Sequence, residues 1–277
     1  METKTNKSKA DSVKWKVNYT AFRAIFRRDL KVFFSNFRHN MLRVILQPLF
    51  FIIVFGFMLT KGGVLSSDFS KYMVPGLITI GVMFSAGFGV VALVGLSFFR
   101  DKEIRSQIQS PISTELLGLE KIIYGTFQGV ISGLIVLVLS WLILRNSIVI
   151  IFPDFLHILL FLVVLVLTGI IFASLGLIVS SVFRIPALMF ESFNLAVTTF
   201  MFFGGTFFSL ELAERISPFL KYFLFLIPNV YTNEAIRGMI IPGVESLSVW
   251  YCILGLLIFA VLTVYLGIKA FKKRAIN

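Results

Sequence analysis

The sequence predicts an all-α membrane protein with six transmembrane helices, an N-terminal cytoplasmic interfacial helix, and an extracytoplasmic re-entrant helical hairpin between spans five and six. Hydrophobic residues make up 57% of its 277 residues, and charged residues only 14%. The apolar residues gather in runs of about 20, long enough for a helix to cross the roughly 30 Å hydrocarbon core of a bilayer. Cys252 is the single cysteine, which excludes an internal disulfide and a thiolate metal cluster.

The N-terminal part of the chain divides into two segments. Residues 1–12 are polar, and we expect a disordered basic tail there. In residues 13–40, apolar side chains recur at steps of three and four, which predicts one face of an amphipathic helix. This face comprises Trp15, Tyr19, Phe22, Phe26, Leu30, Phe33 and Phe37. Because Arg23 and Arg27 lie off it, the helix should lie at the anionic cytoplasmic leaflet, either as a plain anchor or with a further role.

Six membrane spans are predicted within residues 41–271, and 272–277 form a cytoplasmic tail. The spans are Met41–Thr60, Met73–Phe99, Ile122–Leu144, Phe155–Phe183, Glu191–Phe208 and Trp250–Phe271. The fifth of them is short and carries Asn194 and the pair Gly204-Gly205. Such residues are expected in a helix that packs against other helices rather than against lipid.

Residues 209–246 form the predicted outer hairpin. The apolar run within Ser217–Gly243 is only about ten residues long, is interrupted by Lys221 and stops at Pro228, so it is too short to span and suits a re-entrant element. This topology places 20 of the 26 Lys and Arg residues on the cytoplasmic side, in agreement with the positive-inside rule. A seventh span would move the basic tail, Lys272–Arg274, to the outside.

The connection between spans two and three is unusually rich in charge, with eight of the forty charged side chains in residues 97–121. Asp101 and Arg105 are four residues apart and can pair on one turn of helix. Ser113 is placed to cap the next helix, and Glu115 in its first turn complements the helix dipole. The pattern predicts a short helix, a break and a fresh helix, with an ordinary solvated loop as the alternative.

Residues with catalytic chemistry are scarce. The sequence has no G-x-x-x-x-G-K-[ST] loop for nucleotide phosphates, no G-x-S-x-G elbow and no acidic pair for a divalent ion, so we expect no catalytic, cofactor or metal site in this chain. His39 and His157 match no ligand spacing. Ionisable residues are nearly absent from the predicted span interiors, which argues against ion-coupled transport. Gln47, Gln128 and Asn194 either line a pathway or form interhelical hydrogen bonds.

Three stretches carry a pattern that extends over most of the chain. The first is "LRVILQPLFFIIVFGF", with its Gln-Pro pair. The second is "YMVPGLITIGVMFSAGFG" followed by "FFRDKEIRSQIQSPISTELLGLEKIIYG", a charged turn with Pro-Ile-Ser before a helix. The third is "NLAVTTFMFFGGTFFSLELAERISPFLKYFLFLIPNVYTNEAIRGMI", a Gly-rich run with a Phe-Ser turn, Pro-Asn and "EAIRG". In this order they resemble the ABC-2 family of transporter permeases, and most of all its drug, lipo-oligosaccharide and polysaccharide exporter branch.

The resemblance implies a homodimer in the inner (plasma) membrane of a prokaryote, with both termini cytoplasmic. It also implies two copies of a separate cytoplasmic ATPase that binds ATP and Mg. Residues 100–112 would be a coupling helix that docks into this ATPase, and the interfacial helix would touch it too. The docking residues would be Arg100, Asp101, Lys102, Glu103, Ile104, Arg105 and Ile108. The hairpin would gate the outer end through Phe219, Phe223, Pro228, Asn229, Tyr231, Glu234 and Arg237.

Taken together, these features predict the permease subunit of an ATP-binding-cassette exporter for an amphipathic or lipid-linked substrate. An ion-coupled secondary transporter or channel without an ATPase is the alternative, and a membrane enzyme acting on lipids is a third class. The net charge of +12 is attributed to topology, so we expect membrane lipid and no nucleic acid among the partners.

Overall fold

A computed structural model of the chain is predominantly helical, with no strand among the residues that it describes. These residues are 2–65, 67–99, 112–145, 149–208, 210–244 and 246–276. Side chains are described from Asn18 onward, apart from those at 39–41, 43, 44, 67, 68, 96 and 99.

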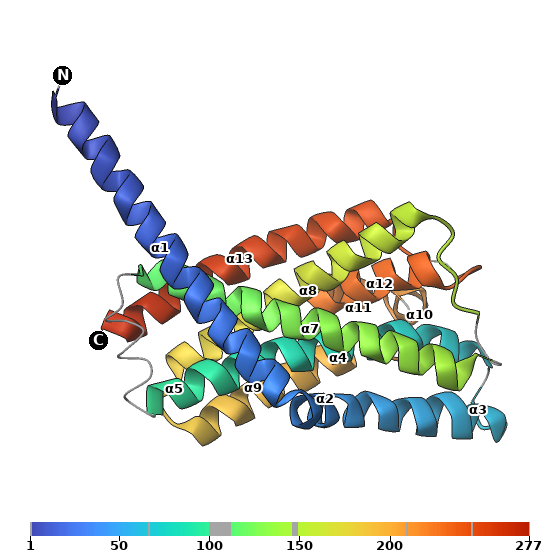
Figure 1. Cartoon of the computed structure of the whole chain (residues 1–277). Helices are drawn as coiled ribbons and strands as arrows, with labels where there is room; N and C mark the ends of the chain where they lie inside the picture. Colours follow the sequence, from blue (N-terminus) through green and yellow to red (C-terminus); the bar gives the residue numbers. More distant parts are fainter. Residues whose placement is uncertain are drawn as a thin grey trace.

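Five of the described helices are long and apolar enough to cross a membrane. Figure 1 shows them side by side in one bundle. The first, Phe69–Gly95, comprises most of α4 (Ser67–Val90) and the π-helix η2 (Val91–Gly95), and α5 (Leu96–Phe99) follows it. The others are α7 (Thr114–Leu144), α8 (Phe155–Val182), α9 (Pro186–Phe203) and α13 (Val249–Ile276). The chain therefore has the architecture of a multi-pass helical membrane protein.

The first predicted span corresponds to three consecutive helices. They are α2 (Phe37–Phe51), the π-helix η1 (Ile52–Met58) and α3 (Leu59–Lys61). The apolar part of this run, Ile45–Lys61, is shorter than the five candidate spans. A sixth crossing by this run, and with it the six-span topology, stays a prediction.

One helix lies several residues from its predicted position. Helix α9 begins at Pro186 and ends at Phe203, whereas the sequence predicted Glu191–Phe208. Pro186 stands at the start of the helix, where its missing N–H is not needed. Gly205 then adopts a φ of +71°, a conformation that ends the helix and that glycine accommodates best.

Helix α1 (Glu2–Ser35) extends over the segment predicted to be a disordered tail. Residues 2–12 contain neither Gly nor Pro, so nothing in their composition terminates a helix. At its other end α1 stops before Asn36, where the chain turns into α2. The amphipathic helix and the first apolar helix are thus joined by a single-residue break.

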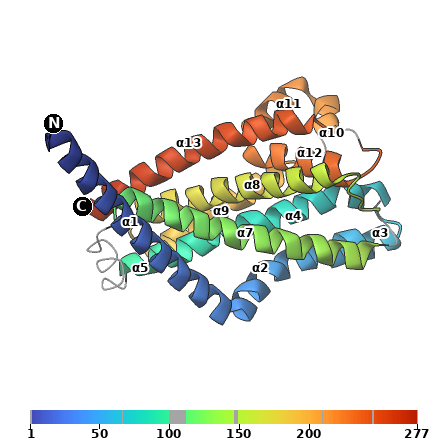
Figure 2. The same cartoon turned by 45° about the horizontal axis from the view of Figure 1, so that its top comes forward.

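The two ends of the bundle differ in what they carry. In Figures 1 and 2 the chain termini, the end of α5 and the start of α7 lie at one end, which we call the terminal end. Helices α10 (Leu210–Ile216), α11 (Pro218–Leu224) and α12 (Pro228–Ile240) lie at the opposite end, which we call the hairpin end. This arrangement separates the segments predicted to be cytoplasmic from those predicted to be outside.

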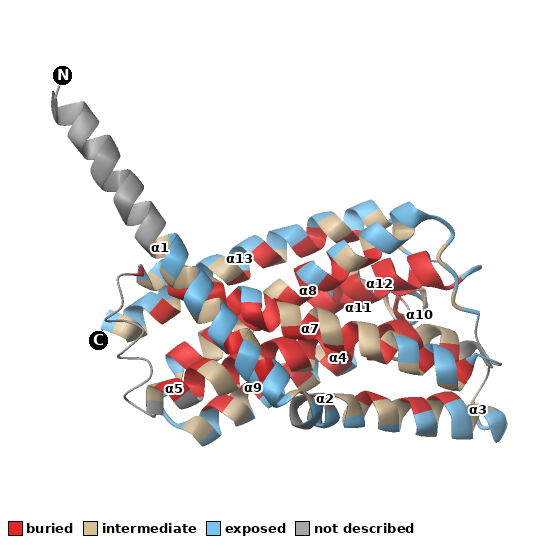
Figure 3. Cartoon of the chain, viewed as in Figure 1, coloured by how far each residue is buried: buried red, intermediate tan, exposed pale blue. Residues whose placement is uncertain are grey.

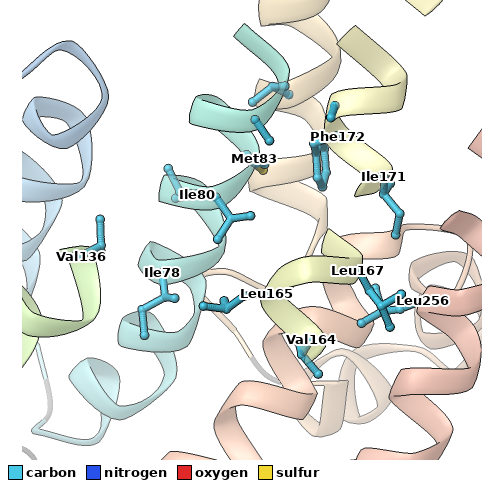
Figure 4. Packing of buried hydrophobic residues seen from close by; sticks show 14 of the residues in the cluster. Ile78, Ile80, Met83, Val136, Val164, Leu165, Leu167, Ile171, Phe172 and Leu256 are labelled. Carbon is cyan, nitrogen blue, oxygen red and sulfur yellow. The ribbon is translucent and has the colours of Figure 1, made fainter. Parts of the chain in front are cut away.

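The core of the bundle is formed where α4, α7 and α8 pack together. Figure 3 shows buried residues on each of these helices, together with intermediate and exposed ones. Figure 4 shows Ile80 and Met83 of α4 beside Leu165 and Phe172 of α8. Glycines permit the closest approach of these helices. A Cβ built on Gly176 would lie 2.6 Å from the carbonyl oxygen of Gly87.

Replacing Gly176 with valine should destabilise the protein by about 1–3 kcal/mol or more, because α4 and α8 must separate to admit the side chain. The measurement is thermal unfolding of the purified protein, followed by the reaction of a fluorogenic maleimide with the buried Cys252. Ala187→Val, at an exposed position on α9, is the control and should leave the transition nearly unchanged. Equal transitions for the two variants would refute the close packing of α4 and α8.

Candidate functional site at the two ends of the helix bundle

The predicted coupling segment lies outside the described residues, which include none of Arg100, Asp101, Lys102, Glu103, Ile104, Arg105 and Ile108. The helix that follows it is described in full. The N–H of Leu116 donates to the Ser113 hydroxyl oxygen over 3.3 Å, and Glu115 lies in the first turn. The predicted helix cap is therefore confirmed, and α7 begins immediately after the charged connection.

The start of α7 is tied to the C-terminal end of α13. The Lys272 ammonium lies 2.7 Å from the Glu115 carboxylate in an exposed ion pair. Two residues later, the Arg274 guanidinium donates to the backbone carbonyls of Ser180 and Phe183, which are left without helical partners at the end of α8. It also lies 4.0 Å from the centre of the Phe98 ring. The basic tail thus joins α5, α7, α8 and α13 at the terminal end.

A buried cluster of charges joins α1 to α7 nearby. The Lys121 ammonium lies 2.6 Å from one Asp29 oxygen and 2.8 Å from one Glu120 oxygen. The three side chains are 4%, 1% and 0% exposed, respectively. Such burial is tolerated only when the charges are paired.

The burial of Glu120 and Lys121 within the protein differs from the solvated connection that the sequence indicated before Ile122. Helix α7 begins at Thr114, two turns before the predicted span at Ile122, so Glu120 and Lys121 belong to the buried helix rather than to a solvated connection. No local pattern indicates the pairing of Lys121 with Asp29, because the two residues are 92 positions apart. Glu234 and Arg237 in α12 are buried as well.

The amphipathic face of α1 packs against protein over its described part. Phe33 is fully buried beside Tyr124 of α7, and Phe26 packs on the same cluster. Phe22 is half-buried against the main core. Arg23 and Arg27 are exposed, and the side chain of Trp15 lies outside the described residues. The predicted division between an aromatic and a basic face is present, with part of the aromatic face on α7.

At the hairpin end, Arg237 connects three parts of the chain. Its guanidinium is fully buried and pairs with the Glu234 carboxylate. It also donates to the carbonyl oxygens of Tyr72 at the start of α4 and Gly205 after α9, each over 3.2 Å. The Tyr72 ring lies below it, 5.3 Å from the guanidinium carbon. Arginine is suited to this position because its planar fork serves several acceptors at once.

The other polar residues of α12 bind neighbouring backbone groups. Glu234 accepts from the N–H groups of Leu210 and Leu247, each over 3.4 Å. The Asn229 amide donates to the carbonyl of Phe200 over 3.2 Å, and the Asn233 amide donates to that of Gly204 over 2.7 Å. Helix α12 therefore fixes the end of α9, the start of α10 and the approach to α13. The bonds to these three segments would be lost together if α12 moved.

The predicted outer-gate residues separate into two groups. Pro228, Asn229, Glu234 and Arg237 are buried, and Tyr231 is half-buried with its hydroxyl donating to the Phe225 carbonyl over 2.9 Å. The α11 aromatics Phe219 and Phe223 are exposed instead. The first group holds the hairpin in place, and the second presents an aromatic surface.

The three amides that the sequence assigned either to a pathway or to interhelical hydrogen bonds are not brought together. The Gln128 amide is buried and donates to the Tyr124 hydroxyl, one turn earlier on α7, over 2.8 Å. Gln47 on α2 contacts the Met201 sulfur on α9 at 3.9 Å. Asn194 is exposed on α9. Gln128 also lies against α4, because a Cβ built on Gly89 would clash with its amide oxygen. Gln47 and Gln128 therefore each contact a neighbouring helix, at different places in the bundle.

Long apolar helices with charged groups gathered toward the two ends are typical of a multi-pass membrane protein. Residues 20–241 match the model of the ABC-2 type transporter family, and the chain belongs to this family. Membership implies the permease of an ABC transporter, in which a partner ATPase supplies the energy. None of the curated proteins compared with the chain matches it.

Proposed function

We propose that this chain is the permease subunit of an exporter in a prokaryotic inner membrane. It moves an amphipathic or lipid-linked substrate as a homodimer, driven by two copies of a separate ATPase on which ATP and Mg bind. The observation that carries the proposal is the family match over 20–241, which spans the terminal end, the bundle core and the hairpin end.

The ATPase docks at the terminal end in this proposal, through residues 100–112 and the basic face of α1. Two contacts around the segment support this role. The capped first turn of α7 follows the segment directly, and Lys272 joins that turn to α13. A force applied to the segment therefore reaches α7 and α13 at their ends.

The hairpin end serves as the outer gate, with α12 as its fixed part. The buried polar contacts of Arg237 and Asn233 hold the turn after α9. The exposed aromatic side chains of α11 are free to meet an amphipathic substrate or lipid. Charged groups of the hairpin, such as Glu214, remain at its surface.

The topology predicts opposite labelling of two exposed positions. In a Cys252→Ala background, Glu214→Cys in the hairpin should react with a membrane-impermeant maleimide on intact cells, because Glu214 is 53% exposed at the proposed outer end. Arg184→Cys, in the exposed link between α8 and α9, should react only after permeabilisation. Labelling of Arg184→Cys on intact cells would refute this orientation. Glu234, which also lies in the predicted hairpin, is buried and unsuitable for the experiment.

The substrate class is tested by ATP hydrolysis in the reconstituted complex. The chain and its ATPase are placed in nanodiscs and supplied with lipid-linked glycans or with hydrophobic drugs. We expect one of these classes to stimulate hydrolysis. Stimulation by neither would contradict an amphipathic or lipid-linked substrate.

An ion-coupled transporter is the second candidate. The observation that favours it is the burial of the Asp29, Glu120 and Glu234 carboxylates within the protein, because ion relays use acids that are enclosed by the protein. Proteoliposomes with the chain alone distinguish the two. The exporter requires ATPase and ATP, whereas an ion-coupled transporter accumulates substrate when only a proton or sodium gradient is imposed.

A further inference from the structure

Four side chains of alternating charge connect the surface of α1 to the interior of α7. Arg28 pairs with Asp29 over 2.8 Å, Asp29 with Lys121 over 2.6 Å, and Lys121 with Glu120 over 2.8 Å. Arg28 is 48% exposed and Glu120 is 0% exposed. With two positive and two negative members, the chain of charges is neutral as a whole.

Glu120 is the one residue of this charged cluster that is not required for an ion pair between α1 and α7. Asp29 and Lys121 already form a close ion pair between α1 and α7. The Glu120 carboxylate is paired with the Lys121 ammonium of its own helix, 2.8 Å away. Burying a second acid here costs free energy, so its presence calls for a separate explanation.

Glu120 and Lys121 are neighbours on α7 and stay together whatever α1 does. When α1 moves away, Asp29 leaves with it, and Lys121 would be stranded as an unpaired buried charge. The Glu120 carboxylate prevents this, because it is already 2.8 Å from the ammonium. The contact between the two helices can therefore open at a much lower cost than an isolated buried pair.

The surroundings suit a contact of this kind. Phe33 and Tyr124 are buried beside the charges and exclude water, which strengthens the closed pair. Helix α7 leads directly from the charged connection that ends at Ser113. Helix α1 carries the exposed basic residues Arg23 and Arg27 on its other side.

We propose that Asp29, Lys121 and Glu120 form a releasable clamp between α1 and α7. In the closed state Asp29 pairs with Lys121 and joins the two helices. In the open state Lys121 pairs with Glu120 alone. The three are positioning residues: they set whether α1 moves with α7 or apart from it during the ATPase cycle. The proposal rests on the proposed function, since it assumes that an ATPase acts at the terminal end.

The test measures the separation of α1 and α7 by pulsed EPR in nanodiscs. Spin labels are placed at Ala24→Cys and Ile123→Cys, which are exposed positions on the two helices, in a Cys252→Ala background. The complex with its copurified ATPase is measured without nucleotide and after trapping with ATP and vanadate. We expect a short separation without nucleotide and a longer one after trapping.

Two isosteric variants should shift this equilibrium in opposite directions. Asp29→Asn removes the closing pair and should favour the long separation without nucleotide, by about tenfold in the ratio of the two populations. Glu120→Gln removes the partner of the open state and should hold the short separation even after trapping, also by about tenfold. Glu115→Gln breaks the exposed pair with Lys272 and should leave the ratio unchanged.

Shifts in the same direction, or no shift in either variant, would overturn the clamp. The triple variant Asp29→Asn/Glu120→Gln/Lys121→Met carries no buried charge at the site, so no charge is left unpaired in it. It therefore tests the open state if Asp29→Asn alone does not fold. It should show the long separation without nucleotide, and a short separation would contradict the proposal. If no ATPase copurifies, the proposed function fails, while the nucleotide-free populations of the variants still decide whether the clamp exists.

Discussion

Replacing Arg237 with methionine should lower the stability of the protein by about 3–5 kcal/mol, the usual cost of removing one partner of a buried ion pair. The change leaves the Glu234 carboxylate buried without its cation. It also leaves the carbonyl oxygens of Tyr72 and Gly205 without the donor that the guanidinium supplies. The loss is measured from thermal unfolding, with the reaction of the buried Cys252 as the signal.

Arg215→Met is the matched control, because Arg215 also pairs with a glutamate on its own helix but is 73% exposed. Exposed pairs contribute about 0–1 kcal/mol, so this variant should unfold close to the wild-type temperature. Glu234→Gln/Arg237→Met should recover part of the loss, because no charge is then stranded. If Arg237→Met unfolds at the same temperature as Arg215→Met, Arg237 does not stabilise the hairpin end.

Reversing Arg100, Lys102 and Arg105 to glutamate should reduce transport per ATP hydrolysed by about tenfold or more. The reason is that like charges placed across a docking contact repel by several kcal/mol. The helices of the bundle should remain folded, since the segment lies outside the spans. The measurements are copurification of the ATPase, ATP hydrolysis and transport in proteoliposomes.

The control for this variant reverses Arg184, Lys269 and Lys273, which are exposed basic residues of the link between α8 and α9 and of the last turns of α13. It changes the net charge by the same amount in the segments predicted to be cytoplasmic, so it separates a docking effect from a general electrostatic one. Equal transport by the two triple variants would rule out residues 100–112 as the docking segment.

The sequence predicted the helical features that depend on neighbouring residues. The face of α1 follows from the spacing of Phe22, Phe26 and Phe33, and the start of α7 follows from the capping position of Ser113. Both patterns are local, so they are visible in one sequence. The membrane spans follow from the same kind of evidence, because an apolar run and its length are read from consecutive residues.

The buried charges were beyond such patterns. Lys121 pairs with Asp29, which is 92 residues away in the sequence. Arg237 donates to the carbonyl of Tyr72, which is 165 residues away. Periodicity reports which face of a helix is apolar, but it does not report which polar residue meets a partner once helices pack. Helix α12 illustrates this. Its polar composition predicts side chains that are exposed to solvent, but these side chains are buried by the segments that they bind. Several of these residues, such as Glu234 and Arg237, were named from the sequence, but the partners that they bind are seen only in the fold.

The most direct test of the central claim is affinity purification of the chain from membranes of the cells that encode it, followed by transport in proteoliposomes. The account predicts that an ATPase with a G-x-x-x-x-G-K-[ST] loop copurifies in comparable amount, and that substrate moves only when this ATPase and ATP are both present. Transport by the chain alone, with no ATPase bound, would contradict it.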